Sequence, residues 1–395
     1  MTGTSFASIL FLLSIVILVN SVSAHPRSKK FFKFIPSVFW IYFLPIVFSA
    51  LGLVDPKNQV FTILPSILLP AALLLLLLSS DVKGIIKCGR PALTMMFAGS
   101  LGIMVATPLV FFFFKDLVGP QFWSGFGALS GSWIGGSANM IAVKESINTP
   151  EPVFLPMVIV DTVVPYVWMG LLVGMAGLQP LFDKWNRADR SVIDKMALKH
   201  FSAPVAAPRA HGNCAGVLLS AEITVVTVVG VVVSKFLAGL LPEIKDMIST
   251  YAWMIIIVSA MGVFLSCTPV KKLENFGASK IGYFLLYLVL ASIGARAGVV
   301  NVGPVLFLIL AGFLIVFFHA GVLFLTARLI RAPLFLVAVS SQANIGGVAS
   351  APIVASIYQP GLASIGLLLA ICGNITGTYL GIITSQVCRF VAEKL

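Results

Sequence analysis

Long apolar runs recur along the whole chain and restrict what it can fold into. Each run has about 17–28 residues, and a helix needs about 20 to cross a bilayer. Lipid offers no hydrogen bonds to the backbone, so helices are the expected form of such runs. The runs occupy residues 5–23, 35–54, 60–80, 93–114, 121–143, 153–178, 214–241, 250–269, 281–300, 302–327, 332–357 and 362–387. The sequence therefore predicts an all-α integral membrane protein with about 11–12 transmembrane helices.

The composition agrees with a chain that crosses the membrane many times. Of its 395 residues, 59% are hydrophobic and 10% are charged, whereas a soluble domain has about 25% charged residues. The net charge of +12 comes from basic residues in short loops beside the apolar runs, as in cytoplasmic loops of membrane proteins. We therefore expect the lipid bilayer, and no nucleic acid, as the partner of these residues.

Two apolar runs are interrupted by glycine and polar residues, one in each half of the chain. The first interruption is Ser130-Gly-Ser-Trp-Ile-Gly-Gly-Ser-Ala-Asn139-Met140, and the second is Ser340-Ser-Gln-Ala-Asn344-Ile-Gly-Gly347. Irregular backbone inside a membrane is tolerated only where it faces protein or a water-filled cavity. A matched pair of interrupted segments indicates the binding site of a secondary transporter. For the first segment, a stripe of small residues for close helix packing is the alternative.

The polar stretch 179–213 is predicted to be a linker that divides the chain into two transmembrane repeats. The first repeat is 1–178 and the second is 214–395. After each interrupted run, an acidic or amide residue and a tyrosine follow at the same spacing. The matching pairs are Asp161 with Asn374 and Tyr166 with Tyr379.

The two repeats can be inverted or parallel, and the sequence gives one argument for each orientation. Basic loops gathered on one side favour inverted repeats, because loop 81–90 and its counterpart 297–301 then lie on opposite sides. Twelve simple crossings would shift the second repeat by an even number of spans and so favour parallel repeats. We expect inverted repeats, each with one broken helix.

Five titratable side chains fall inside the apolar runs, and such residues are functional-site hypotheses by default. They are Asp161, Glu222, Lys235, Arg296 and His319. Lys235 and Arg296 lie near the ends of their runs, where long side chains reach the interface. Glu222 is expected at an interface or in an ion pair. His319 is expected to be a hydrogen-bonded packing residue, with a proton relay as the alternative.

Asp161 is the strongest candidate because it follows the first interrupted helix directly. A buried carboxylate must be protonated, paired or bound to a cation. With the Asn139 oxygen and freed backbone carbonyls, Asp161 is predicted to hold Na⁺. Transfer of a coupling proton and an ion pair with Arg296 are the alternatives. The predicted substrate and ion site consists of Ser132, Ser137, Asn139, Asp161, Ser341, Gln342, Asn344 and Asn374.

Sequence signatures of enzymes are missing, so we expect no catalytic residues and no cofactor besides Na⁺ or H⁺ as the coupling ion. The five cysteines lack the spacing of a metal site or a disulfide framework. Val22-Ser23-Ala24 resembles a signal cleavage site, but no basic residue precedes the first run, so we expect a retained first helix. The lack of a clear transit peptide favours the plasma (inner) membrane.

The segment Gly131-Ser-Trp-Ile-Gly-Gly-Ser-Ala-Asn139, with Ala142-Val143, resembles the YjcL-like family of uncharacterised membrane proteins. The resemblance extends to Ser341-Gln-Ala-Asn-Ile-Gly-Gly347 and to Leu285–Arg296, and covers nearly the whole chain. At superfamily level, that family is similar to cation:proton antiporters, bile-acid:sodium symporters and glutamate:sodium symporters. The resemblance implies inverted repeats whose broken helices cross near the bilayer midplane. It implies no particular substrate, because a shared fold does not fix function.

We expect an ion-coupled (Na⁺ or H⁺) secondary transporter of a small anionic or carboxylate-bearing solute, working by alternating access. Half-helix N-termini at the interruptions favour an anion, Asp161 would be the coupling residue, and Asn139 and Asn344 would bridge the crossing breaks. A core would contain 93–178 and 302–387, and the other spans would form a scaffold that can provide a homodimer interface. The alternatives are a cation:proton antiporter without organic substrate, a non-transporting receptor or scaffold, and an intramembrane enzyme.

Overall fold

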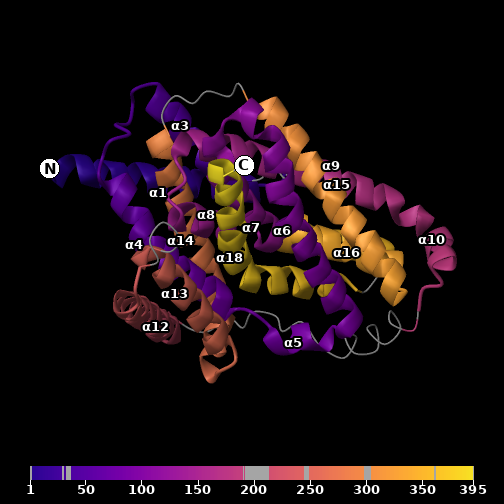
Figure 1. Cartoon of the computed structure of the whole chain (residues 1–395). Helices are drawn as coiled ribbons and strands as arrows, with labels where there is room; N and C mark the ends of the chain where they lie inside the picture. The colour runs from indigo at the N-terminus through magenta and orange to yellow at the C-terminus, as the bar shows by residue number, and fades with distance from the viewer. Residues whose placement is uncertain are drawn as a thin grey trace. The chain divides into compact units, whose positions relative to one another are not determined.

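The computed structural model describes residues 2–28, 31–32, 37–189, 191, 213–243, 249–297, 304–359 and 362–394. These residues form helices and connecting turns, without strands, as the apolar runs predict (Figure 1). Every predicted apolar run contains helix. Among the described residues, eight helices are long and apolar enough to cross a membrane, or nine if the pair bent by 94° at Cys267 and Thr268 is one span. The chain is therefore an all-α, multi-pass membrane protein, and the count of 11–12 crossings stays a prediction.

The helices form two compact units, and each unit takes segments from both halves of the chain. Unit 1 comprises Met1–Ser79, Pro150–Val158 and Pro208–Gly303, and unit 2 comprises Ser80–Thr149, Ile159–Ala207 and Pro304–Leu395. Compact packing therefore does not follow the halves 1–178 and 214–395, because helices of one half pack on helices of the other. Apart from 150–158, unit 2 agrees with the predicted core. The internal repeat stays a prediction.

Unit 1 is built around the contacts of α4 with α13 and α14 (Figure 1). Gly262 of α13 and Gly282 of α14 face α4 so closely that an added Cβ would meet its backbone and leucine side chains. Helix α1 packs on α3 and α14, with Leu12 and Val16 fully buried, and its retention stays a prediction. The helices of unit 1 are α1 (Thr2–Ala24), α3 (Ser37–Ala50), α4 (Val60–Leu78), α12 (Asn213–Leu240), α13 (Thr250–Ser266), η3 (Pro269–Phe276) and α14 (Ala278–Ala297).

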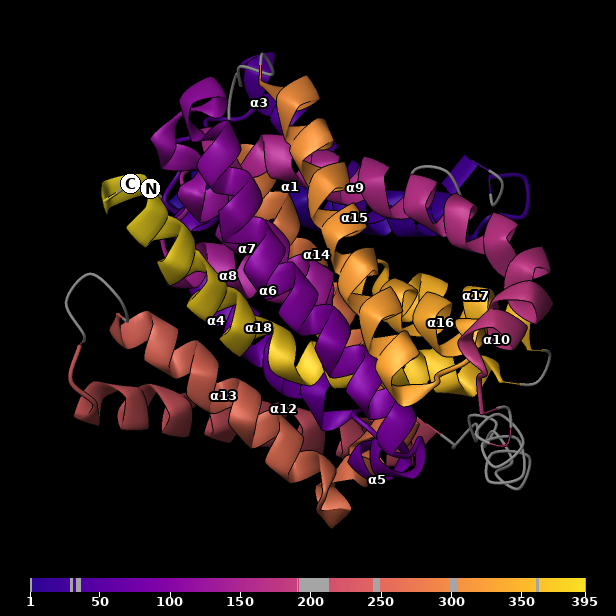
Figure 2. The same ribbon diagram turned by 45° about the vertical axis from the view of Figure 1, so that its right-hand side comes forward.

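Unit 2 contains both predicted interruptions, and each is a break between two helices. Helix α9 begins in unit 1 and continues through unit 2. In unit 2, α18 runs beside α7 and α6 (Figure 2). The helices are α5 (Val82–Lys87), α6 (Arg90–Val118), η1 (Pro120–Phe122), α7 (Trp123–Gly135), α8 (Ser137–Ser146), α9 (Glu151–Gly174), η2 (Met175–Leu178), α10 (Gln179–Asn186), α15 (Val305–Ile330), α16 (Leu334–Ile345), α17 (Gly347–Tyr358) and α18 (Ala363–Lys394).

The small residues of α7 serve close helix packing as well as the break. They form a stripe that faces an equally small stripe on α18, and a Cβ added to Gly127, Gly135, Gly377 or Gly381 would clash across the contact. The facing pairs are Gly127 with Ser385, Gly131 with Gly381 and Gly135 with Gly377. Without side chains between them, the two backbones approach closely, as small-residue motifs allow in membranes. The packing stripe and the helix break are therefore both present in the first interrupted segment, and its role as a binding site stays a prediction.

The polar stretch 179–213 is only partly described. Its first residues form α10, which packs on unit 2, whereas residues 190 and 192–212 lie outside the described residues. Asp183 accepts a hydrogen bond from the Leu334 N–H at the start of α16, at 2.9 Å. Asn186 donates to the carbonyls of Ala327 and Ala332, at the end of α15 and just beyond it, at 3.0 and 2.8 Å. The beginning of the expected linker is thus an ordered part of unit 2.

Replacing Gly136 with alanine is expected to lower the free energy of unfolding by about 1–3 kcal/mol. Gly136 has φ +86° and ψ 171°, a region that is essentially restricted to glycine. The measurement is denaturation of the purified protein in mixed micelles. Gly174→Ala is the matched control, because Gly174 has φ −60° and nothing lies near its added Cβ. Equal stability of the two variants would contradict the break at Gly136.

Candidate functional site

The two helix breaks lie next to each other in unit 2. Gly136 separates α7 from α8, and Gly346 separates α16 from α17. A Cβ placed on Gly347 would lie 4.0 Å from the Cα of Gly136, so the backbones of the two breaks approach each other at these glycines. Neither α8 nor α17 has a side-chain N-cap. Uncapped N–H groups, and the partial positive charge of a helix start, are therefore brought together from both half-helices.

Asn139 fixes the first break to α18. Its side chain is 3% exposed, and its Nδ2 donates to the carbonyl of Gly135 and to that of Asn374, the latter at 3.3 Å. Its Oδ1 accepts a hydrogen bond from the hydroxyl of Thr378. Both the nitrogen and the oxygen of this amide are therefore hydrogen-bonded within the protein. These bonds hold the buried turn that follows Gly136 in place.

Asn344 fixes the second broken helix to α6. Its amide is best satisfied when Oδ1 accepts from the Ser100 hydroxyl at 2.9 Å and Nδ2 donates to the carbonyls of Met96 and Ser340 at 3.2 Å. The side chain lies against Gly99, where an added Cβ would clash with it. Asn344 is fully buried, so the protein satisfies this amide as completely as that of Asn139.

These contacts differ from the predicted bridge between the two breaks. Asn139 and Asn344 each join a broken helix to a continuous helix, α18 and α6 respectively. The physical reason is close packing, because Gly377 of α18 and Gly99 of α6 bring these helices within reach of a short amide side chain. The two residues hold the breaks from outside and do not connect them.

Ser341 lies at the centre of a hydrogen-bond chain that joins three further helices. His319 Nδ1 lies 2.8 Å from the Gly99 carbonyl, and its Nε2 lies 3.0 Å from the Ser341 hydroxyl. Because a carbonyl only accepts, Nδ1 carries the proton and Nε2 accepts from Ser341. The indole of Trp168 donates to the same hydroxyl at 2.9 Å. His319 is thus a fully bonded packing residue, as expected, and its neutral form satisfies every group in the chain.

Gln342 brings an unpartnered polar atom to the second break. Its Nε2 donates to the Ser350 hydroxyl at 2.7 Å, and this amide occupies the space that a Cβ on Gly346 would fill. Its Oε1 is buried and has no hydrogen-bond partner. An orphaned buried acceptor costs about 1–3 kcal/mol, which a ligand that donates a hydrogen bond would recover.

Asp161 of α9 lies beside the last turn of α7, which ends at the first break. The carboxyl group faces the Ser132 hydroxyl and the Trp133 indole of α7, and Nε1 of Trp133 makes no hydrogen bond of ordinary geometry. The Ser132 carbonyl accepts the N–H of Gly136, so Ser132 connects the carboxylate to the break. Asp161 is only partly buried, and it is therefore open to an ion or a proton.

The predicted site residues divide into two groups in unit 2. Ser132, Ser137, Asn139, Asp161 and Asn374 lie around the first break, and Ser137 is exposed there at the start of α8. Asn374 Oδ1 lies 3.3 Å from a Cβ added to Gly136. The other three, Ser341, Gln342 and Asn344, lie on α16 before the second break.

The other intramembrane charges are not part of this group. Arg296 forms an ion pair with Glu151 at 3.1 Å inside unit 1, which corrects its alternative pairing with Asp161; its placement at the membrane interface stays a prediction. The residue ends α14 where α9 begins with an acidic side chain, so the partner is local to unit 1. Glu222 and Lys235 are exposed on α12.

Several contacts near the two breaks were not predicted from the sequence. Thr378, Ser100 and Trp168 satisfy the polar residues of the site, and only their position inside apolar runs distinguishes them in sequence. Lys144 and Glu145 of α8 form an ion pair at 2.7 Å with a Lys144 side chain only 4% exposed. Their charges stand just beyond run 121–143, and extending that run by one turn would have identified them.

The Asp161 carboxylate and the Ser132 hydroxyl supply oxygen atoms, which suit a hard cation or a proton, and the Trp133 indole beside them can only donate a hydrogen bond. Among the described residues, no group of three His, Cys, Asp or Glu side chains is placed to hold a metal ion. Asn139 was predicted to help hold Na⁺, but its Oδ1 accepts from Thr378. Asp161 and the Ser132 hydroxyl remain the side-chain oxygens near the break for such an ion.

Together, the helices and the paired breaks define a multi-pass membrane protein with two broken helices in one compact unit. The chain belongs to the family described as "Protein of unknown function (DUF819)", whose model matches residues 8–391. It is similar to the uncharacterized membrane protein YjcL of Bacillus subtilis (strain 168), with 25% identity over 356 residues, 85% of this chain and 86% of that protein. The resemblance to the YjcL-like family is thus confirmed.

Ser341→Ala is expected to lower the free energy of unfolding by about 1–3 kcal/mol, because it leaves buried nitrogens of His319 and Trp168 without a partner. Ser356→Ala is the matched control, since Ser356 is exposed on α17 and bonds only the carbonyl of Ile353 in its own helix. Denaturation in mixed micelles measures both. An equal loss of unfolding free energy in the two variants would show that the hydrogen bonds through Ser341 do not stabilise unit 2.

Proposed function

We propose that this chain is a secondary transporter in which Na⁺ or H⁺ drives movement of a small carboxylate-bearing solute. The observation that carries the proposal is the contact between the two uncapped breaks, with a carboxylate one helical turn away. Matched interruptions of this kind form the binding sites of secondary transporters. Placement in the superfamily of sodium symporters and cation:proton antiporters, and inverted repeats, belong to the same proposal.

The charge balance at the breaks supplies a reason for coupling. The N-terminal ends of α8 and α17 attract an anion, whereas an ionised Asp161 repels it at short range in a medium of low dielectric constant. An anion therefore binds well only when Asp161 is protonated or holds a cation. Cation and solute then bind together, which is the thermodynamic requirement of a symporter.

The roles of the individual residues follow from which atoms are already satisfied. Asp161 and the Ser132 hydroxyl would hold the coupling ion, while the N–H groups at Ser137 and Gly347 and the side chain of Asn374 would face the solute. Asn139, Asn344 and Ser341 would position the breaks, because their polar atoms are occupied by protein partners.

A cation:proton antiporter without organic substrate is the second candidate. It is favoured by the placement of Asp161, a partly buried carboxylate that two cations can occupy in turn. In that case no solute would donate a hydrogen bond to Oε1 of Gln342, which has no partner in the protein. A receptor or scaffold with the same fold would use neither group.

The setting we propose is the plasma (inner) membrane, and the assembly we propose is a homodimer. Helix α12 of unit 1 carries a long exposed apolar face on which lipid or a second copy can pack. Its exposed members are Val225, Val228, Val229, Val232, Val233, Phe236, Leu237 and Leu240.

Asp161→Asn is expected to abolish a sodium-specific rise in melting temperature, because the neutral amide no longer attracts the ion. A ligand that binds the folded state raises the melting temperature by mass action. The measurement compares the melting temperatures of purified protein in Na⁺ and in K⁺ across neutral pH, from mildly acidic to mildly alkaline buffer. Asp116→Asn is the control, because Asp116 is exposed near the end of α6.

The outcomes distinguish the candidates. A sodium effect that Asp161→Asn removes and Asp116→Asn keeps supports a sodium site, and a pH effect with the same pattern supports proton coupling. Uptake of labelled carboxylates into vesicles under that gradient would then identify the symporter. Proton movement driven by ions alone would favour the antiporter. An unchanged response in Asp161→Asn would contradict both.

A further inference from the structure

Helix α10 lies where a membrane surface is expected. Helix α9 has 24 residues, and its length of about 36 Å exceeds the roughly 30 Å of a hydrocarbon core. The 3₁₀ turn Met175–Leu178 and then α10 follow α9 directly. Residues from Gln179 onward therefore belong to the level of the lipid headgroups.

Helix α10 buries its polar face and exposes its apolar face, which is the opposite of a helix on the surface of a soluble domain. Its polar residues Gln179, Asp183 and Asn186 are buried, with exposures of 5%, 5% and 0%. Its apolar residues Leu181 and Trp185 are 70% and 63% exposed. The spacing places the two sets on opposite sides, so the polar side holds α15 and α16 and the apolar side is offered to lipid.

Four exposed basic side chains surround this apolar face. Arg328 packs over the Trp185 ring at 5.0 Å and donates to its carbonyl at 3.4 Å. Within the part of the chain that the structure describes, the four are Lys184, Arg187, Arg328 and Arg331. The acidic neighbours are Asp183, whose carboxylate bonds the Leu334 N–H, and Asp189, whose carboxylate bonds the Ser191 N–H. The four basic side chains outnumber the two carboxylates, so the patch carries a net positive charge.

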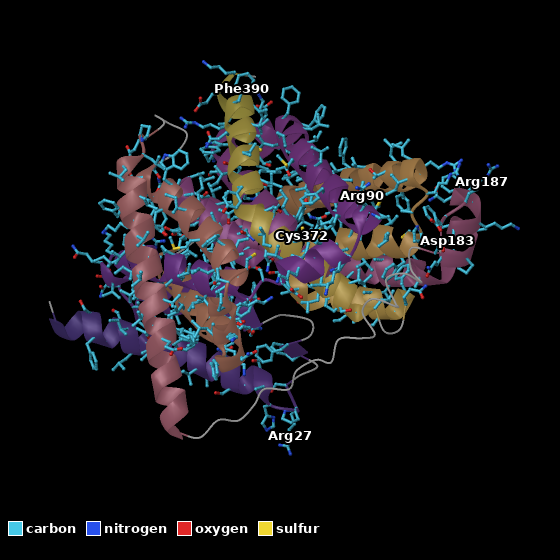
Figure 3. The ribbon with its side chains drawn as sticks, turned by 90° about the horizontal axis from the view of Figure 1, so that it is seen from below. Arg27, Arg90, Asp183, Arg187, Cys372 and Phe390 are labelled. Atoms are coloured by element: carbon cyan, nitrogen blue, oxygen red, sulfur yellow. The ribbon has the colours of Figure 1, made fainter. Side chains whose placement is uncertain are left out.

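Two of these arginines occupy positions where glycine would be easier to accommodate. Arg187 ends α10 at φ +50° and Arg331 ends α15 at φ +53°. Helices that end in this left-handed conformation usually place glycine there, and other residues there carry strain that is typical of functional sites. A hydrogen bond of 2.9 Å from the Asp189 N–H to the Arg331 carbonyl joins the two turns. Figure 3 shows Arg187 pointing outward from the end of α10, and Asp183 on the side toward α15 and α16.

We propose that the surface formed by α10 and the α15–α16 turn is a binding site for the headgroup of an anionic phospholipid. Arg187 and Arg331 bind the phosphate, since guanidinium groups match phosphate oxygens in a fork geometry. Leu181 and Trp185 contact the acyl region, where tryptophan is enriched at membrane interfaces. The site belongs to the cytoplasmic leaflet, which carries anionic lipid and attracts basic segments.

The site is connected to the second broken helix and to the helix that carries Asp161. Asp183 caps the start of α16, which leads to the second break, and α10 continues from α9, which carries Asp161. Lipid bound here stabilises the arrangement of α9 and α16, so transport is expected to depend on anionic lipid.

The test measures the melting temperature of the full-length protein in detergent with short-chain phosphatidylglycerol, short-chain phosphatidylcholine or inorganic phosphate. Phosphatidylglycerol is expected to raise the melting temperature, whereas phosphatidylcholine and inorganic phosphate are expected to leave it unchanged. In the double variant Arg187→Gly and Arg331→Gly, affinity for phosphatidylglycerol should fall roughly 10–30-fold. Its melting temperature without lipid should be equal or higher, because glycine relieves the strain at positive φ.

The control variant Lys83→Gln with Lys87→Gln removes two exposed charges from α5 and should keep the lipid response. Three results would overturn the proposal. One is a wild-type lipid response in the double glycine variant, and another is an equal loss in the α5 variant. The third is an equal effect of inorganic phosphate, which would assign the arginines to a free anion and not to lipid.

Discussion

Inside a bilayer every backbone N–H and carbonyl needs a partner within the protein, and the arrangement of unit 2 depends on this constraint. Two helix breaks expose such groups at Gly136 and Gly346. The breaks are held in place because α18 and α6 approach the broken helices through glycine contacts, and because Asn139 and Asn344 reach across those contacts. The breaks are therefore a fixed part of the packing and not local defects in long helices.

Most polar atoms near the breaks form hydrogen bonds that hold the breaks in place. The polar atoms without such bonds are the candidates for binding a ligand. Ser341, His319 and Trp168 satisfy one another. The groups left over are the exposed start of α8 at Ser137, the orphaned oxygen of Gln342 and the partly exposed carboxylate of Asp161. A folded membrane protein that leaves these groups open beside two helix N-termini is well suited to bind a small polar ligand.

The sequence predicts the breaks well because a membrane tolerates irregular backbone within an apolar run only where that backbone faces protein or a cavity. It also identifies Asp161 and the amides, because polar residues are rare in such runs. It does not predict that Asn139 pairs with Thr378 or Asn344 with Ser100, since these partners are more than two hundred residues away in the chain and depend on helix packing. The charge of the stretch after residue 178 predicted a linker, whereas Asp183 and Asn186 are buried caps for α15 and α16.

The central claim is that the contact between the breaks is a site reached in turn from the two sides of a membrane. Ser137 is exposed at that contact, so a single cysteine there, in a chain whose native cysteines are replaced by serine, reports its accessibility. The measurement is labelling by a membrane-impermeant maleimide in right-side-out and inside-out vesicles, with and without an ion gradient. The account predicts labelling from both sides, in a ratio that the gradient shifts. Labelling from one side only under every condition would contradict it.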